Sequence, residues 1–203
     1  MSDGRKQPAR EALRPKIISA ALRLLENDGF SGLQARRLAQ QVGCSVGTIY
    51  NLFGSMDELI LATNSVTLKE MRQHLSQADN NWTGSDTDAY GRLMALASAY
   101  FQFYQDHEKR WAAVFEFQRD DDEHMPGWYL EEIGLLMAQI ENIIAHLSGA
   151  GLPEQRARIA RALWAATHGI VTLSFSGRLG PVRRETVLED VDIVVKAVVD
   201  GLR

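Results

Sequence analysis

Features that would indicate several other classes of protein are missing from this sequence. The 203 residues include one cysteine, Cys44, so no disulfide can form within the chain, and a reducing compartment such as the cytoplasm is expected. No apolar run reaches the roughly 18–20 residues that span a bilayer. Residues 1–16 are polar and basic, unlike a secretory signal. We therefore expect a cytoplasmic protein with no membrane partner.

Signatures of catalysis and of cofactor binding are also missing. The sequence has no nucleophile with a matched base, no His-Glu-x-x-His spacing, no phosphate loop and no dinucleotide fingerprint. The acidic run 120–123 with His124 is either a solvated loop, which we favour, or a metal cluster. We expect no enzymatic activity, no cofactor and no metal.

Charge is distributed unevenly, although the net charge is only −4. Residues 1–55 carry eight Lys or Arg against four Asp or Glu, whereas the rest of the chain carries 14 against 22. A basic end is typical of a nucleic-acid footprint. A chance fluctuation on a solvated surface explains it equally well.

Apolar residues recur at helical spacing along the whole chain, and no segment alternates as a strand would. The predicted class is therefore all-α, with about nine helices. We predict a compact three-helix unit over residues 1–54, with a basic arm at 1–14. A larger helical domain over residues 55–203 follows it.

Two short predicted helices, 33–42 and 45–52, are joined by a tight turn and match a helix-turn-helix. Ser45 is the expected N-cap of the second helix. Gly47 has no Cβ, so this helix can approach a phosphate backbone or base edges closely. Its free first-turn N–H groups can receive a phosphate.

Several polar side chains surround this turn. Ser45 and Thr48 offer short hydroxyls, and the phenol of Tyr50 can reach a phosphate. Arg36 and Arg37 lie on the preceding helix, where either can bind a guanine in bidentate fashion or a phosphate. The sequence therefore predicts DNA contacts from both helices.

A denser pattern runs through the same segment. The sequence contains, in order, Gly29-Phe30, Leu38-Ala39, Gly43-Cys44-Ser45, Gly47-Thr48-Ile49-Tyr50, Phe53 and Glu58-Leu59. Over residues 15–61 this resembles the TetR family of bacterial transcriptional regulators. The resemblance implies DNA contacts at Arg36, Ser45, Val46, Gly47, Thr48, Tyr50 and Asn51.

The resemblance also assigns roles to the two predicted domains. It implies a DNA-binding domain over residues 1–54 and a ligand-binding, dimerising domain over 55–203. The expected protein is a homodimeric repressor that binds a palindromic double-stranded operator and responds to a small-molecule effector. A helical adaptor or structural dimer that has lost specific DNA binding is the alternative.

One position departs from the family pattern. The family usually has a phosphate-binding lysine where this chain has Met56, which implies one phosphate contact fewer. The basic arm, with Arg5, Lys6, Arg10 and Arg14, is either a compensating DNA contact or a solvated tail.

The second half resembles a TetR subgroup with a Trp-His-Gly signature, here Trp164, His168 and Gly169. Ligand pockets are typically apolar with a few polar anchors. The predicted pocket residues are Phe101, Tyr104, Trp111, Phe115, Trp164 and His168. Plain core packing is the other interpretation for these aromatic residues, and a core histidine bonded to a neighbour is the other interpretation for His168.

An apolar stripe at helical spacing closes the chain, and we predict that it forms the dimer interface. Its members are Val191, Val194, Val195, Val198, Val199 and Leu202. Burial within the subunit is the alternative. Cys44 is interpreted as a packed small residue in preference to an oxidant sensor.

Overall fold

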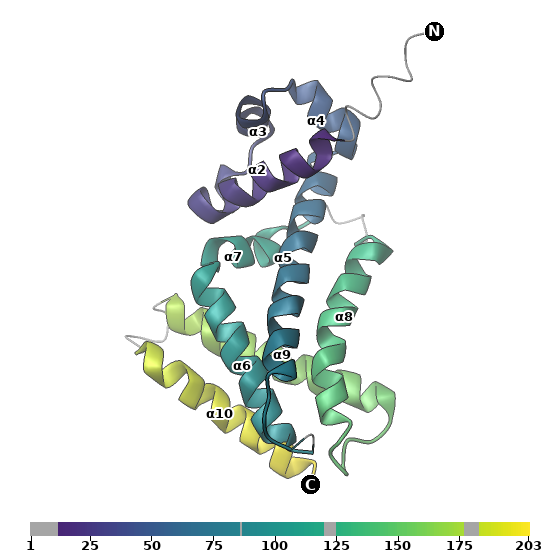
Figure 1. The fold of residues 1–203 in the computed structure, drawn as a ribbon, viewed down its shortest axis with the longest axis vertical. Coiled ribbons are helices and arrows are strands. Elements are labelled where there is room, and N and C mark those ends of the chain that lie inside the picture. The colour runs from purple at the N-terminus through teal and green to yellow at the C-terminus, as the bar shows by residue number, and fades with distance from the viewer. Residues whose placement is uncertain (1–11, 86, 120–124, 177–182) are drawn as a thin grey trace. The chain divides into compact units, whose positions relative to one another are not determined.

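The computed structural model describes residues 12–85, 87–119, 125–176 and 183–203. Within these ranges the chain is all-helical, with nine α-helices and no strand, which confirms the predicted class. The elements, shown in Figure 1, are α2 (Leu13–Asp28), the 3-10 turn η1 (Phe30–Gly32), α3 (Ala35–Val42), α4 (Val46–Phe53), α5 (Met56–Asn80), α6 (Ala89–Asp106), α7 (Glu108–Glu116), α8 (Gly127–Ile144), α9 (Pro153–Phe175) and α10 (Arg184–Gly201).

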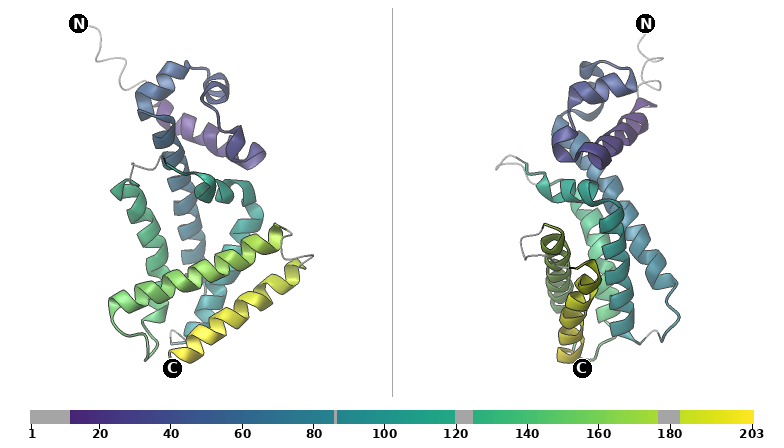
Figure 2. Two further views of the ribbon diagram at one scale, coloured as in Figure 1. Left: turned by 180° about the vertical axis from the view of Figure 1, so that it is seen from behind. Right: turned by 90° about the vertical axis from the view of Figure 1, so that its left-hand side faces the viewer.

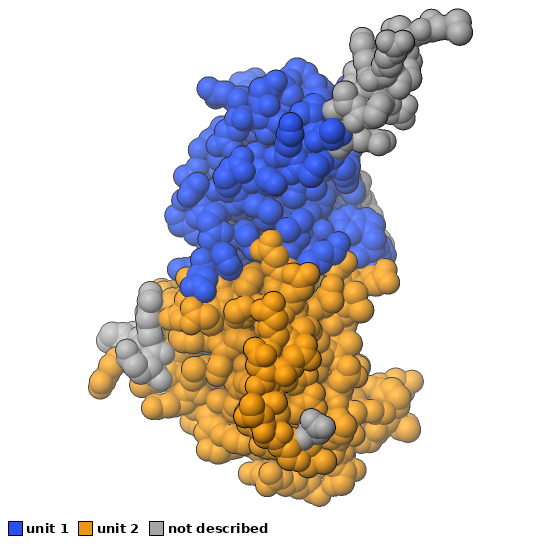
Figure 3. Space-filling view, viewed as in Figure 1, with its two compact units in different colours: residues 1–69, 106–130 blue, residues 70–105, 131–203 orange. Residues whose placement is uncertain are grey.

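The chain divides into two compact units, which are coloured separately in Figure 3. The first unit comprises residues 1–69 and 106–130, and the second comprises residues 70–105 and 131–203. The unit that contains the helix-turn-helix therefore extends past residue 54, because it includes the first part of α5 and the whole of α7.

In the first unit, α2, α3 and α4 share one apolar core. Ile17 and Leu24 of α2, Leu38 of α3 and Ile49 of α4 are each at most 2% exposed. The apolar spacing in the sequence places these side chains on the inward faces of three short helices. Their common burial holds α4 against α2 and α3 while its other face stays in solvent.

The start of α5 is capped by a side chain. The Ser55 hydroxyl accepts a hydrogen bond of 3.1 Å from the Glu58 N–H, which supplies a partner for one of the N–H groups that a helix start leaves unpaired. The Glu58 carboxylate pairs with Arg119 at 3.5 Å. The cap therefore fixes where α5 begins, directly after the helix-turn-helix.

The middle of α5 carries buried polar residues within the first unit. Thr63, Asn64 and Thr67 are all 0% exposed. The Asn64 side-chain amide donates to the carbonyl oxygen of Ala113 in α7 at 3.3 Å. Burial raises the pKa of Tyr129 to about 12, although the Asn64 side chain, which hydrogen-bonds the phenol, acts in the opposite direction. The bond from Asn64 to Ala113 joins α5 to α7 inside the first unit.

The second unit is tied together by polar contacts as well as by apolar packing. Arg92 of α6 forms a bidentate pair with Asp79 of α5, with both bonds at 2.8 Å. The Tyr90 hydroxyl donates to Asp192 of α10 at 2.5 Å, and Lys196 donates to the other carboxylate oxygen at 2.5 Å. Figure 2 shows α9 and α10 lying side by side. Val191, Val195 and Val199 of α10 are buried.

Candidate functional site

A tight turn sets the direction in which α4 leaves α3. Gly43 ends α3 with φ of 73° in the left-handed region, where a residue with a Cβ is strained. The N–H of Cys44 donates to the carbonyl oxygen of Ala39 at 3.0 Å. Cys44 itself is half-buried in this turn. The turn therefore requires a glycine for a reason that lies entirely inside the chain.

Ser45 begins α4 as predicted from the sequence. Its hydroxyl oxygen accepts the N–H of Thr48 at 3.1 Å and lies 2.9 Å from the Thr48 hydroxyl. This cap satisfies one first-turn N–H group and leaves the helix dipole with its positive end at Val46. The two hydroxyls lie together at the start of the exposed helix end, where an anion is favoured.

The faces of α4 differ sharply. Ile49 is fully buried and Phe53 is 6% exposed. Gly47, Tyr50 and Asn51 are exposed, with Tyr50 at 43%. Positions three and four apart share one side of a helix, so these three residues form a single outward face. Ser45 is exposed beside it, and Val46 and Thr48 are half-buried.

Among the described residues, nothing near Gly47 requires a glycine at this position. A Cβ placed on Gly47 has the Ser45 hydroxyl oxygen at 3.7 Å as its nearest neighbour, an ordinary van der Waals contact. Glycine lowers helix stability relative to alanine. The backbone of α4 is therefore open at Gly47 to close approach from outside the chain.

The two arginines of α3 have different surroundings. Arg37 donates to the Asp28 carboxylate at 2.6 Å and to the carbonyl oxygen of Gly32 at 3.2 Å. These bonds hold the end of α2 and η1 against α3. Arg36 is exposed on the same helix. Arg37 is exposed as well, and its bonds to Asp28 and Gly32 give it a structural role within the chain.

Arg14 belongs to α2 and contacts α4. Its guanidinium donates to the carbonyl oxygen of Leu52 at 2.9 Å and lies 4.3 Å from the centre of the Phe53 ring. The remaining basic residues of the predicted arm, Arg5, Lys6 and Arg10, lie outside the described residues. Met56, at the position where the family usually has lysine, is half-buried at the first turn of α5.

The six predicted pocket residues are divided between the two units. Trp111 and Phe115 belong to the first unit, where their ring centres are 5.4 Å apart. Phe101 and Tyr104 belong to the second unit and pack on Phe175, with ring centres at 5.9 and 5.0 Å. The remaining two residues, Trp164 and His168, lie on α9.

Tyr100, which the sequence did not single out, contacts both Trp164 and His168. Its hydroxyl is 2.6 Å from Nδ1 of His168, and its ring meets Trp164 edge-on at 4.8 Å. Trp164 stacks on His168 with an interplanar angle of 12°. Burial lowers the pKa of His168 below its ordinary value, which favours the neutral imidazole. His168 therefore has the bonded neighbour that a core histidine requires.

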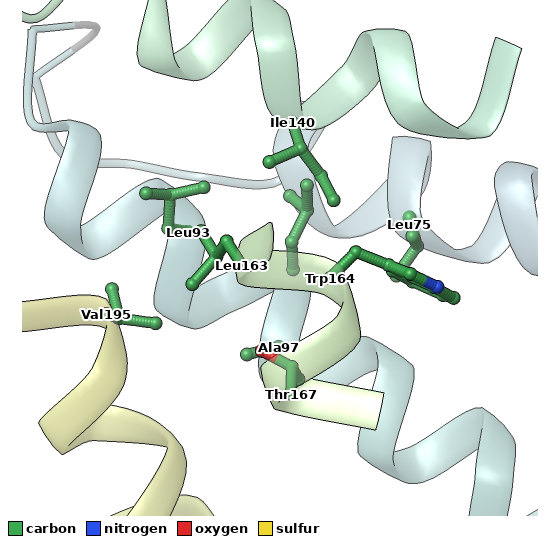
Figure 4. A pocket seen from close by; sticks show the side chains of 9 residues that line it. Leu75, Leu93, Ala97, Ile140, Leu163, Trp164, Thr167 and Val195 are labelled. Carbon is green, nitrogen blue, oxygen red and sulfur yellow. The ribbon is translucent and has the colours of Figure 1, made fainter. Parts of the chain in front are cut away.

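A small cavity lies in the second unit, and Trp164 of this aromatic cluster forms part of its wall (Figure 4). Its volume is about 30 Å³. The lining residues are Leu75, Leu93, Leu96, Ala97, Ile140, Leu163, Trp164, Thr167 and Val195. Of the predicted pocket residues only Trp164 lines it. The remaining lining residues are mostly aliphatic. Apolar residues that line a cavity have the same helical spacing in the sequence as apolar residues that fill a solid core.

The predicted dimer stripe is partly covered within the single chain. Val191, Val195 and Val199 are at most 1% exposed. The other three members, Val194, Val198 and Leu202, are half-buried. Ile193 of α10 is a large apolar residue that is 66% exposed, and Leu173 of α9 is 40% exposed. Exposed apolar surface therefore includes Leu173 and Ile193 in addition to the half-buried members of the predicted stripe.

Two other expectations concern ions and membranes. Residues 120–124, which include the acidic run and His124, lie outside the described residues. Among the residues that the structure does describe, no group of three or more His, Cys, Asp or Glu side chains is arranged to hold a metal. No helix in the described part of the chain has the length and apolar character that crossing a membrane requires.

Comparison with protein families identifies the chain. Residues 17–63 match the model for bacterial regulatory proteins of the tetR family. Residues 93–202 match the model for the tetracyclin repressor-like C-terminal domain. The chain belongs to the TetR family. It is a TetR family transcriptional regulator with the helix-turn-helix described above, and the family consists of regulators, with no enzymatic activity indicated.

Relatives and solved structures agree with this assignment. The uncharacterized HTH-type transcriptional regulator Rv0681 of Mycobacterium tuberculosis is 25% identical over 87% of this chain and 77% of its own length. A protein of unknown function from Rhodococcus sp. RHA1 has a TM-score of 0.72 at 27% identity, covering 94% of this chain and 95% of that one. The fatty acid degradation regulator FadR from Bacillus halodurans, at 17% identity over 93% and 99% of the two chains, has a TM-score of 0.65 and shares the fold.

Proposed function

We propose that this TetR family regulator binds a palindromic DNA operator as a homodimer, with α4 in the major groove. The exposed face of α4 carries the proposal, above all the open backbone at Gly47. The contacts we propose come from Arg36, Ser45, Val46, Gly47, Thr48, Tyr50 and Asn51. Arg37 is set aside because its guanidinium is bonded to Asp28 and Gly32.

These side chains suit the two kinds of contact that DNA recognition needs. Phosphate contacts fix the register, and base contacts give sequence preference. The Tyr50 phenol and the capped start of α4 suit phosphates, because the helix dipole is positive there. Arg36 and Asn51 have the planar, forked groups that read guanine and adenine edges. The proposed interface thus combines positioning and readout.

A two-fold dimer follows from the same proposal. Palindromic half-sites match a symmetric pair of recognition helices. The exposed apolar side chains of Leu173 and Ile193 support an interface on the outer side of α9 and α10. The half-buried members of the predicted stripe, Val194, Val198 and Leu202, border it. We also assign Trp164, His168 and Gly169 to the Trp-His-Gly subgroup of the family.

Regulation by a small molecule completes the proposed function. We infer that an effector binding in the C-terminal region changes the DNA affinity of a repressor. Such an effector acts only through a difference in its affinity for the DNA-competent and DNA-incompetent states, and the coupling is reciprocal. The small cavity in the second unit supports the presence of a site that a ligand can occupy.

A selection experiment tests DNA recognition without assuming an operator. The purified full chain is used to enrich duplexes from a random library, and affinity is then measured by fluorescence anisotropy at several salt concentrations. Enrichment of a palindrome is expected, with binding weakened by Tyr50→Phe and Arg36→Ala. Gln73→Ala, an exposed position on α5, is the matched control. Enrichment of no sequence would favour the helical adaptor.

A further inference from the structure

The cavity lined by Trp164 and Thr167 differs in chemistry from three hollows on the surface of the same chain. Each of these three hollows is open to solvent and has charged side chains in its wall. The charged residues are Lys16 and Arg23 in the first hollow, Glu154 and Arg158 in the second, and Lys196, Asp200 and Arg203 in the third. The cavity wall, by contrast, is formed by side chains from α5, α6, α8, α9 and α10 that converge on one space (Figure 4). This convergence places the cavity in the middle of the second unit.

No ionisable side chain lines the cavity. Its polar side chains are the Thr167 hydroxyl, on a residue that is 7% exposed, and the indole N–H of Trp164. Leu75, Ile140 and Val195 typify the remaining wall. A charged molecule entering this space would lose its hydration without gaining a counter-charge, which strongly disfavours it. Apolar cavities, in contrast, stay dry and accept hydrocarbon ligands.

The polar groups next to the cavity do not supply a counter-charge either. The Tyr100 hydroxyl and Nδ1 of His168 are bonded to each other at 2.6 Å. Burial lowers the pKa of His168, so this imidazole is neutral rather than cationic at physiological pH. The Trp164 ring packs on both of them. A carboxylate ligand would therefore find no cation at this wall.

The size of the cavity indicates how a ligand enters. A volume of about 30 Å³ holds about one water molecule and no more. Trp164 is the wall residue with the largest side chain, and it is only half-buried. If the Trp164 indole rotated away from the cavity, the cavity would become both larger and open to solvent.

We propose that this cavity takes an uncharged, mainly hydrocarbon effector, which displaces the Trp164 indole as it enters. The inference rests on the proposed function, since it names the class of small molecule to which the regulator responds. Cationic and anionic effectors are excluded by the composition of the wall. Thr167 offers one hydrogen bond, which suits a single hydroxyl or carbonyl on the ligand.

Three eight-carbon probes that differ only in their head group test this proposal. Octan-1-ol, octanoate and octylammonium are titrated into the full-length protein by isothermal titration calorimetry at pH 7.5. Octanol is expected to bind at least tenfold more tightly than either ion. Equal or tighter binding of octanoate or octylammonium would overturn the proposal.

Two substitutions locate the bound probe. Ala97→Leu fills the cavity and is expected to weaken octanol binding at least tenfold. Ser98→Leu adds the same bulk to the exposed side of α6 and should leave octanol binding unchanged. Leu163→Ala enlarges the cavity and is expected to tighten binding of a bulkier alcohol, cyclohexylmethanol. Octanol binding that survives Ala97→Leu in a folded protein would place the probe elsewhere and refute the site.

Two further measurements on the same protein samples test the ligand proposal and the DNA-binding proposal independently. Circular dichroism shows whether each variant is folded, and DNA anisotropy on the selected duplex reports the regulator function independently. A chain that binds the duplex but shows no preference for octanol refutes the ligand class alone. A chain that binds octanol in the cavity but enriches no duplex refutes the DNA-binding proposal alone.

Discussion

The Arg14 guanidinium donates a hydrogen bond of 2.9 Å to the carbonyl oxygen of Leu52, in the last turn of α4. The carbonyl groups at a helix end lack partners within the helix, and the dipole is negative there. The Arg14 cation from α2 therefore caps the C-terminal end of the recognition helix, whereas Ser45 caps its N-terminal end. Both ends of α4 are fixed by side chains.

Loss of this contact should loosen the C-terminal end of α4 while leaving the side chains of α4 itself unchanged. Arg14→Met keeps the aliphatic stem over Phe53 but removes the charge and the donor. We expect urea unfolding to show a loss of about 1 kcal/mol and anisotropy to show weaker operator binding. Lys16→Met, an exposed change on the same helix, is the control. Equal behaviour of the two variants would mean that the Leu52 contact is not needed.

Gly43 and Gly47 lie four residues apart, and they should respond in opposite ways to alanine. Gly47→Ala removes a residue with poor helix propensity and meets no clash, so stability should stay equal or rise by up to about 1 kcal/mol. Operator affinity should nevertheless fall, because the methyl group separates the backbone from DNA. Gly43→Ala, at φ 73°, should destabilise the fold by about 1–2 kcal/mol. Thermal melts and anisotropy on both variants distinguish these outcomes.

Burial of His168 predicts a pH dependence of stability. Its pKa is lowered in the folded chain by desolvation, so below the ordinary value of about 6.5 the unfolded chain binds a proton that the folded chain does not. The contribution of the neutral His168 to the free energy of unfolding is therefore fully present above pH 6.5, and it decreases as the pH falls below 6.5. His168→Gln should reduce this loss between pH 7.5 and 5.5 in thermal melts. His146→Gln, at an exposed position, should melt with the wild-type pH dependence.

Much of the DNA-binding region could be predicted from sequence because its signals are local. The Ser45 cap and the tight turn between the two short helices depend on spacing within one helix or turn. The separate roles of Arg36 and Arg37 could not be predicted. They depend on Asp28, which is nine residues from Arg37 and meets it only when α2 packs on α3.

The cavity in the second unit was harder to predict for a related physical reason. Apolar side chains at helical spacing line a cavity and fill a solid core in the same pattern, so Leu93 and Leu163 gave no signal of their own. Aromatic residues were predicted to line the pocket because of their residue type. Trp111, however, belongs to a different unit from Trp164. The importance of Tyr100 comes from its bond to His168, a contact between helices that are far apart in sequence.

The exposed isoleucine on α10 gives the sharpest test of the proposed dimer. Ile193 is 66% exposed, so Ile193→Lys should leave the stability of a single chain within about 0.5 kcal/mol. At a dimer interface, however, the same change buries an unpaired charge, which strongly opposes association. Sedimentation should then show monomers, and affinity for a palindrome should fall toward that for a single half-site. Leu130→Lys, at a position 52% exposed on α8, is the control and should remain dimeric. If both variants form dimers of equal stability, Ile193 lies outside the interface. The interface would then lie on another face of the chain.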